Sequence, residues 1–258
     1  MQTMTTALQY DGSFEGLLCA CAAALDARAE APEIYADRPG SGGWLFGSEI
    51  VETEPKKAAA LLAAVERHGG GGTVRHLVHA FLADDPEMER AAAGVVRLTI
   101  AKKQNVLGWR QQPLVAALQG MAHRVAHETH RLTGLLRFME LRDGTLYAPC
   151  RPDHNVILPL AVHFKARFPG EKWVIHDRGR ESAVLWDGLR LEQIAEVPPG
   201  IESELSADER AFQRLWHLFT RTIAVRERSN PRLQRQLMPR RYWPHLTEMR
   251  AVPPSPSC

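Results

Sequence analysis

Residues 137–148 decide the fold, and they read RFMELRDGTLYA. Polar and apolar side chains alternate on both sides of Asp143-Gly144, a dipeptide that favours the two-residue turn of a β-hairpin. Two further segments, 173–177 and 183–186, flank a second polar turn. We therefore predict two antiparallel hairpins in one small sheet, with residues 6–11 as a candidate further strand.

Helical patterns occupy most of the chain before this sheet, because apolar residues recur there at helical spacing. Ser13 is a suitable N-cap, and Pro55 suits a first helical turn. After the first hairpin, Asp153 is the expected cap of a helix that ends at Phe168. The helices expected in the N-terminal half cover residues 13–26, 55–68, 74–82, 86–102 and 113–136.

The last long helix is expected to begin at Ser206, because Ser206 and Glu209 have the spacing of a capping box. Its residues Phe212, Leu215, Trp216 and Phe219 share one face, which we expect to be core. The predicted fold class is therefore α+β, with a helical N-terminal half, a small antiparallel sheet of hairpins, and a helical, Arg-rich C-terminal segment.

The length of 258 residues and the 45% hydrophobic composition suit a sizeable core. We predict a single domain over residues 1–250, with a sub-boundary near Leu136 and a linker at 197–200. Residues 251–258 are rich in Pro and Ser and are expected to be disordered. The sequence has no long apolar run and no signal-peptide pattern, which predicts a cytoplasmic, soluble protein with no membrane partner.

Charge is concentrated near the C-terminus. Residues 221–250 contain eight arginines and two glutamates, whereas the whole chain has a net charge of only +2. A guanidinium can bind phosphate through two hydrogen bonds and can stack on bases, so this stretch predicts nucleic-acid binding. The alternative is a solvated helix face. The candidate binding residues here are Arg226, Arg228, Asn230, Gln234, Arg240, Arg241, Tyr242 and Trp243.

Three further arginines, Arg137, Arg167 and Arg180, lie within or beside the predicted sheet, where exposed cations can follow phosphates. They can equally form ion pairs with nearby carboxylates. The acidic residues that would serve as partners are Glu140, Asp153 and Asp177.

His154, His163 and Asp177 are the candidate catalytic residues. An aspartate beside a histidine fixes its tautomer and favours proton transfer, as a general base requires. The alternative reading makes Asp153 a helix cap and Asp177 a turn residue, each accepting backbone N–H groups.

His123, His127 and His130 follow one helical face and form a candidate metal site. Such a site would need further ligands from elsewhere in the chain, and the alternative is that these are surface or packing histidines. We predict no cofactor.

Several ordered segments carry a resemblance to a known family. They include YDGSFEGLL at 10–18, ETHRLTG at 128–134, DHN at 153–155, RFP at 167–169 and IHD at 175–177, together with Arg137-Phe138, His163-Phe164 and the C-terminal arginine block. With these segments the chain resembles bacterial DNA-metabolism proteins of unassigned chemistry. Members of that family occur beside a radical-SAM protein or fused to a uracil-DNA glycosylase domain.

The resemblance implies a role in DNA repair or modification, with a radical-SAM protein or a uracil-DNA glycosylase as partner. The chain lacks the CxxxCxxC pattern of a radical-SAM enzyme, so it is not expected to be that enzyme itself. Two other functions stay open. One is an enzyme acting on damaged DNA by acid–base or metal chemistry, and the other is a scaffold or regulator without DNA affinity.

Overall fold

The computed structural model describes residues 7–26, 33–37, 48–194, 197–224 and 229–250. Its helices and two sheets confirm the predicted α+β class. The chain divides into two compact units, Met1–Ala126 and His127–Cys258. The expectations for Thr6, Arg226, Arg228 and the tail 251–258 fall outside the described residues.

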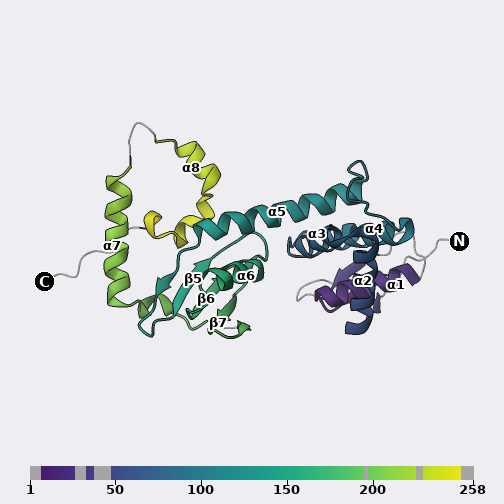
Figure 1. The fold of residues 1–258 in the computed structure, drawn as a ribbon, viewed down its shortest axis with the longest axis horizontal. Helices are drawn as coiled ribbons and strands as arrows, with labels where there is room; N and C mark the ends of the chain where they lie inside the picture. The colour runs from purple at the N-terminus through teal and green to yellow at the C-terminus, as the bar shows by residue number, and fades with distance from the viewer. Residues whose placement is uncertain (1–6, 27–32, 38–47, 195–196, 225–228, 251–258) are drawn as a thin grey trace. The chain divides into compact units, whose positions relative to one another are not determined.

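Unit 1 is mainly helical, with one small sheet (Figure 1). Its three strands are all parallel, in the order β2-β1-β3. Helix α1 packs against α2 and α4. The elements are β1 (Ala7–Tyr10), α1 (Phe14–Asp26), β2 (Ile34–Ala36), β3 (Ser48–Ile50), α2 (Pro55–Gly69), α3 (Gly71–Phe81), α4 (Met88–Lys102) and the first part of α5 (Pro113–Leu135).

The expected helix boundaries of unit 1 agree closely with these elements. The Ser13 hydroxyl accepts the Gly16 N–H at 2.9 Å, as an N-cap does, and Pro55 opens α2. Gly70, with a φ of 77°, separates α2 from α3. No helix in the described residues is both long and apolar enough to cross a membrane.

The N-terminal strand was a candidate further strand of the sheet that contains the hairpins, but it belongs to the other sheet. β1 pairs instead with β2 and β3, for example Leu8 with Ile34. Strand propensity is local, whereas the choice of a pairing partner depends on contacts between distant residues, so the pattern identified the strand but not its sheet.

Unit 2 is built on a five-stranded sheet in the order β4-β5-β6-β7-β8. Its strands β5, β6 and β7 are labelled in Figure 1. Both predicted hairpins are present, because β4 pairs antiparallel with β5, and β6 with β7. The hairpins meet through a parallel pairing of β5 with β6, so the sheet is mixed rather than wholly antiparallel. The elements are β4 (Met139–Glu140), β5 (Leu146–Cys150), α6 (Ile157–Arg167), β6 (Trp173–Asp177), β7 (Ser182–Trp186) and β8 (Leu191–Ile194).

Both faces of this sheet are covered, which is why all five residues of β6 are buried. Helix α6 packs across β6 and β7 on one face, where Phe138, Phe164 and Trp173 form an edge-to-face aromatic cluster. On the other face, Tyr147 and Val174 belong to a second apolar cluster. The parallel step from β5 to β6 requires a crossover, and α6 provides it.

The C-terminal part of unit 2 returns to the sheet before it forms α7. Leu205 forms a bridge with Leu141, and the Ser206 N–H donates to the Glu140 carbonyl. The predicted cap is confirmed, since the Ser206 hydroxyl accepts the Glu209 N–H. The remaining elements are η1 (Ile201–Glu204), α7 (Ala207–Thr222), α8 (Pro231–Leu237), η3 (Arg240–His245) and η4 (Thr247–Met249).

The apolar face of α7 was expected to be core, and that expectation is wrong. Phe212, Leu215 and Phe219 are exposed, and Trp216 is half-buried. The helix packs instead through Trp216 and its polar neighbours, with the Trp216 indole N–H donating to Glu248 at 3.2 Å. Helical spacing shows which residues share a face, but it does not show which face meets the core.

We expect Trp216→Ala to lower the free energy of unfolding by about 1–3 kcal/mol, less than the 3–5 kcal/mol typical of a fully buried tryptophan. The loss comes from the half-buried ring and from its hydrogen bond to Glu248. Urea denaturation would measure it, with Trp216→Phe as a milder variant that keeps a ring between Phe212 and Phe219. A loss above 4 kcal/mol would restore the core assignment.

Candidate functional site

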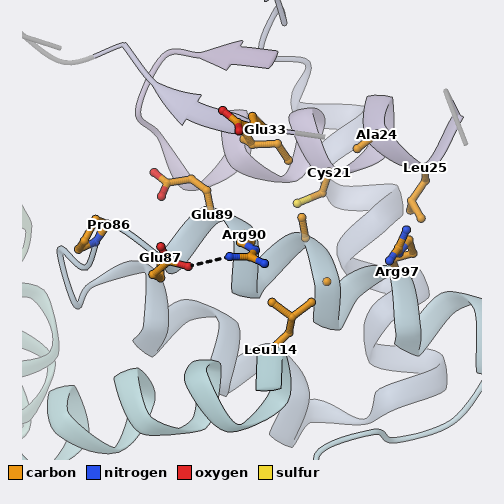
Figure 2. Close-up of a pocket in the computed structure, with 13 residues that line it drawn as sticks. Cys21, Ala24, Leu25, Glu33, Pro86, Glu87, Glu89, Arg90, Arg97 and Leu114 are labelled. Carbon is orange, nitrogen blue, oxygen red and sulfur yellow. Dashed lines mark hydrogen bonds and ion pairs between the residues drawn. The ribbon is translucent and has the colours of Figure 1, made fainter. Parts of the chain in front are cut away.

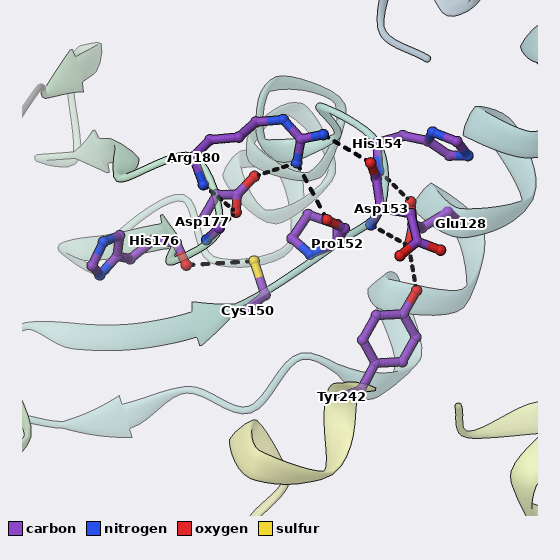
Figure 3. Close-up of polar contacts among 10 residues, drawn as sticks. Glu128, Cys150, Pro152, Asp153, His154, His176, Asp177, Arg180 and Tyr242 are labelled. Carbon is purple, nitrogen blue, oxygen red and sulfur yellow. Dashed lines mark hydrogen bonds and ion pairs between the residues drawn. The ribbon is translucent and has the colours of Figure 1, made fainter. Parts of the chain in front are cut away.

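A buried carboxylate, Glu128 of α5, organises the polar contacts of unit 2 (Figure 3). Its side chain accepts the backbone N–H groups of Asp153 at 3.0 Å and His154 at 2.9 Å. It also accepts hydrogen bonds from the Tyr242 hydroxyl and, at 3.2 Å, from the Arg241 guanidinium. Glu128 therefore ties the loop after β5 to the C-terminal η3.

The environment of Glu128 keeps it ionised. Burial alone would raise its pKa, but the hydrogen bonds from Tyr242, the two backbone N–H groups and Arg241 outweigh burial and hold the pKa below its ordinary value. The pKa of Tyr242 is raised, first by burial and then by its hydrogen bond to Glu128. Tyr242 thus stays a neutral donor at physiological pH.

A second buried carboxylate, Asp177, lies at the end of β6 and is 0% exposed. Its Oδ1 accepts the N–H groups of Gly179 at 2.8 Å and Arg180 at 3.2 Å, and its Oδ2 forms an ion pair with the Arg180 guanidinium at 2.9 Å. Arg180 also donates to the carbonyl oxygens of Pro152 and Asp153. Asp177 acts as a turn residue and as the anchor of Arg180.

The loop between β5 and α6 is therefore held from two sides. Glu128 accepts its N–H groups, and Arg180 donates to its carbonyl oxygens (Figure 3). The expected helix cap at Asp153 is wrong, because α6 begins at Ile157 after Val156. The Asp153 carboxylate instead pairs with Arg241 at 2.9 Å. The backbone polar groups of residues 152–154 and the Asp153 carboxylate are therefore engaged in contacts that hold the loop in place.

The three candidate catalytic residues take different positions. His154 is half-buried in the held loop, Asp177 is buried, and His163 lies on the exposed side of α6 with its ring against Phe164. A different histidine, His176, is hydrogen-bonded to the Tyr147 hydroxyl at 2.8 Å, and burial lowers its pKa. In the described residues, the hydrogen-bond partners of the Asp177 carboxylate include no histidine.

The space beside this network is small. A hollow of about 10 Å³ is lined by Cys150, Tyr242, His245 and neighbouring apolar side chains, which is room for at most one water molecule. Burial raises the pKa of the Cys150 thiol, so this thiol is not an activated nucleophile. Within the described part of unit 2, this hollow does not admit a substrate.

The three candidate metal ligands, His123, His127 and His130, are all exposed on α5. The His127 ring lies 3.4 Å from the Arg131 guanidinium, an unfavourable neighbour for a metal ion. Across the residues with described positions, no three or more His, Cys, Asp or Glu side chains gather as a metal site would require. The metal hypothesis therefore gains no support from geometry.

A larger cleft of about 600 Å³ lies within unit 1 (Figure 2). Its wall carries an exposed pair, Arg90 with Glu87 at 3.4 Å, and the buried Glu89, which accepts a hydrogen bond from Tyr10. Cys21 also lines it, but burial and the charge of Glu89 raise the pKa of this thiol to about 12. The cleft offers volume and charged groups of both signs, without an activated thiol.

The predicted nucleic-acid-binding arginines fall into two classes. Arg137, Arg180 and Arg241 form internal ion pairs; Arg137, for example, binds Glu248 through two nitrogens at 2.7 and 3.2 Å. The pKa of Glu248 is accordingly lowered, because its hydrogen bonds and the charge of Arg137 outweigh burial. These three side chains hold unit 2 together.

Arg167 and Arg240 belong to the second class, which is exposed. Arg167 lies over the Phe168 ring and Arg240 over the Trp243 ring, at 5.6 and 5.7 Å from the ring centroids. Arg232 and Arg235 on α8 are also exposed. In the described residues, none of these four arginines has a carboxylate within ion-pair distance.

The other C-terminal candidates are divided in the same way. Asn230 is exposed, and its side chain caps α8 by accepting the Leu233 N–H. Gln234 is exposed and approaches Met249. Tyr242 is buried against Glu128, and the half-buried Trp243 donates its indole N–H to the Met238 carbonyl at 2.9 Å. The C-terminal segment predicted as one binding surface therefore consists partly of residues that stabilise the fold of unit 2.

Sequence reasoning missed Glu128, although a signal for it was present. Glu128 occupies a position between Val125 and Leu132 at helical spacing, and both of these apolar residues are buried. A carboxylate on an apolar helix face needs partners, because an unpaired buried charge is costly. Arg232 and Arg235 were counted in the arginine block but were not chosen as binding residues.

Comparison with known proteins identifies the family of this chain. A family model described as a domain of unknown function, DUF4130, matches residues 86–248. No curated protein matches the chain. The matched segment contains all the residues of the Glu128 and Asp177 networks. Because it spans more than half of the chain, the protein belongs to the DUF4130 family.

Proposed function

We propose that this protein binds nucleic acid in DNA repair or modification, through exposed arginines of its C-terminal segment, and works with a radical-SAM protein or a uracil-DNA glycosylase. The observation that carries the proposal is the contrast between the two classes of arginine. Arg232, Arg235 and Arg240 are exposed and lack carboxylate partners in the described residues, so their charge is available to a ligand.

The chemistry of these side chains suits a polyanion. Arginine binds phosphate in bidentate geometry, and the Trp243 ring beside Arg240 adds an aromatic surface of the type used for bases. The DNA setting and the partner come from the family resemblance of the sequence. The arginines supply sequence-independent affinity, and the proposal assigns no reaction to the chain.

We expect Arg232→Gln/Arg235→Gln/Arg240→Gln to weaken binding to DNA of any sequence and to reduce the slope of log K against log salt by about two to three units. Each lost phosphate contact removes close to one unit. Fluorescence anisotropy with a labelled oligonucleotide at several salt concentrations would measure both quantities.

The matched control is Arg67→Gln/Arg75→Gln/Arg110→Gln, which removes three exposed arginines from unit 1. It changes the net charge equally and should leave the salt slope at the wild-type value. Arg241 is avoided because its pairs with Glu128 and Asp153 make its loss a stability change. Equal effects of the two triple variants, or a wild-type protein with no DNA affinity, would reject the proposal and favour the scaffold function.

A further inference from the structure

The exposed side of α7 carries several large apolar side chains. Five of the thirteen large apolar side chains that are exposed among the described residues belong to α7 and its C-cap Ile223. On α7, Phe212 is 60% exposed and Leu215 is 64% exposed. Contiguous apolar surface of this kind marks an interaction site rather than ordinary scatter.

Helix α7 is amphipathic, but its polar side and not its apolar side faces the rest of unit 2. Glu209, Gln213, Trp216 and His217 are buried or half-buried against the rest of unit 2, whereas the large apolar residues of the helix other than Trp216 are exposed. Phe212, Leu215, Phe219 and Ile223 follow one line at spacings of three and four residues, and Leu218 widens the face. An amphipathic helix of this type fits into an apolar groove of a partner.

Charge borders this face on one side. Arg210, Arg214 and Arg221 are exposed and follow one helical line, at i, i+4 and i+11. Arg214 and Arg221 have no ion pair within the described residues, and Arg210 donates to the Ser203 carbonyl. A complementary groove therefore carries carboxylates along one edge.

Two other occupants fit this surface less well. A second copy in an antiparallel two-fold arrangement would bring the same edges together and set Arg210 opposite Arg221, which is repulsive. Nucleic acid would need open ring faces, but Trp216 is stacked between Phe212 and Phe219, with interplanar angles of 11° and 26°. The aliphatic side chains of the face offer no stacking.

We propose that the outward face of α7 docks a partner protein through an apolar groove that is edged by carboxylates. This inference rests on the proposed function, in which the chain works with a protein partner, and it names the surface that the partner occupies. The arginines proposed for DNA are on other elements, α8 and η3, so the two surfaces can be tested separately.

The test uses the full chain with two purified probes, the radical-SAM protein and the uracil-DNA glycosylase of the same organism. Calorimetric titration is expected to show that Phe212→Ser/Leu215→Ser binds its partner at least about thirtyfold more weakly, as loss of a central contact does. Arg214→Glu/Arg221→Glu should also weaken partner binding, and the remaining affinity should depend less on salt concentration than that of the wild type. The control Leu158→Ser/Val162→Ser removes two exposed apolar residues from α6 and should bind normally.

Circular dichroism establishes that all these variants are folded before binding is compared. The proposal is overturned if neither probe binds the wild type, or if the α7 variant binds as well as the control. It is also overturned if light scattering shows a dimer that the α7 variant dissociates, or if that variant loses oligonucleotide affinity. If the experiments on the α8 and η3 arginines show no DNA binding, the proposed function fails, but the partner-binding result for α7 is not affected.

Discussion

Glu128→Ala is expected to lower the free energy of unfolding of unit 2 by about 3–5 kcal/mol, the range for breaking a buried ion pair from one side. Glu128 is 3% exposed, and its loss leaves the Tyr242 hydroxyl, two backbone N–H groups and one bond of Arg241 without their acceptor. Domains are stable by about 5–15 kcal/mol, so this loss removes a large fraction of the stability and should lower the melting temperature of unit 2.

Urea denaturation followed by tryptophan fluorescence would measure this loss. Glu171→Ala is the matched control, because Glu171 is exposed and should change stability by less than about 0.5 kcal/mol. Glu128→Gln keeps one oxygen acceptor and should fall between the two. A loss for Glu128→Ala no larger than that of the control would show that the network does not hold unit 2 together.

The same carboxylate gives a pH dependence with a defined sign. The pKa of folded Glu128 lies below its ordinary value of 4.5, so its contribution to stability is fully present above pH 4.5. It is lost as the pH falls through the folded pKa. The difference in stability between wild type and Glu128→Gln should therefore be constant near neutral pH and should shrink below pH 4.5.

Local signals explain what the sequence predicted correctly about the fold. The Asp143-Gly144 turn, the Ser13 and Ser206 caps and the proline that opens α2 act within a few residues of where they stand. For these features the residues that form the sequence pattern are the same residues that stabilise the turn or the helix end. The α+β class followed because hairpin and helix signals occupy separate parts of the chain.

The features that were missed depend on contacts between distant residues. The partner of β1, the surface covered by α7 and the acceptor of the N–H groups of Asp153 are all set by residues that lie far away in the sequence. Asp153 is a residue type that favours the N-cap position. Its N–H nevertheless donates to Glu128, and the helix begins only at Ile157. Tertiary contacts override a local preference of about 1 kcal/mol.

The candidate binding surface was predicted from its arginines, and the structure separates these arginines by whether they form ion pairs. Arg137, Arg180 and Arg241 form ion pairs, whereas Arg240 and Arg167 have no carboxylate partner among the described residues. The sequence does not distinguish the two classes, because an arginine in an ion pair and an arginine on a binding surface are the same residue in the sequence. The structure therefore turns one predicted surface into an internal network and a smaller exposed group.

Asp177→Asn is expected to lower the free energy of unfolding by about 3 kcal/mol, the lower end of the range for a buried pair. The asparagine oxygen can still accept the N–H groups of Gly179 and Arg180, but the ion pair with the guanidinium is lost. Arg180 is partly exposed and keeps its bonds to the Pro152 and Asp153 carbonyls, which limits the cost.

Two measurements separate this structural role from the catalytic role that the sequence indicated for Asp177. Asp187→Asn makes the same change at an exposed turn, where Asp187 also accepts two backbone N–H groups, and it should remain close to wild type. A double-mutant cycle of Asp177→Asn with Arg180→Gln should recover a coupling energy of about 1–3 kcal/mol, because the two side chains act as one unit. If Asp177→Asn is as stable as wild type and the coupling is zero, the ion pair is not structural, and the buried carboxylate is again a candidate for proton transfer.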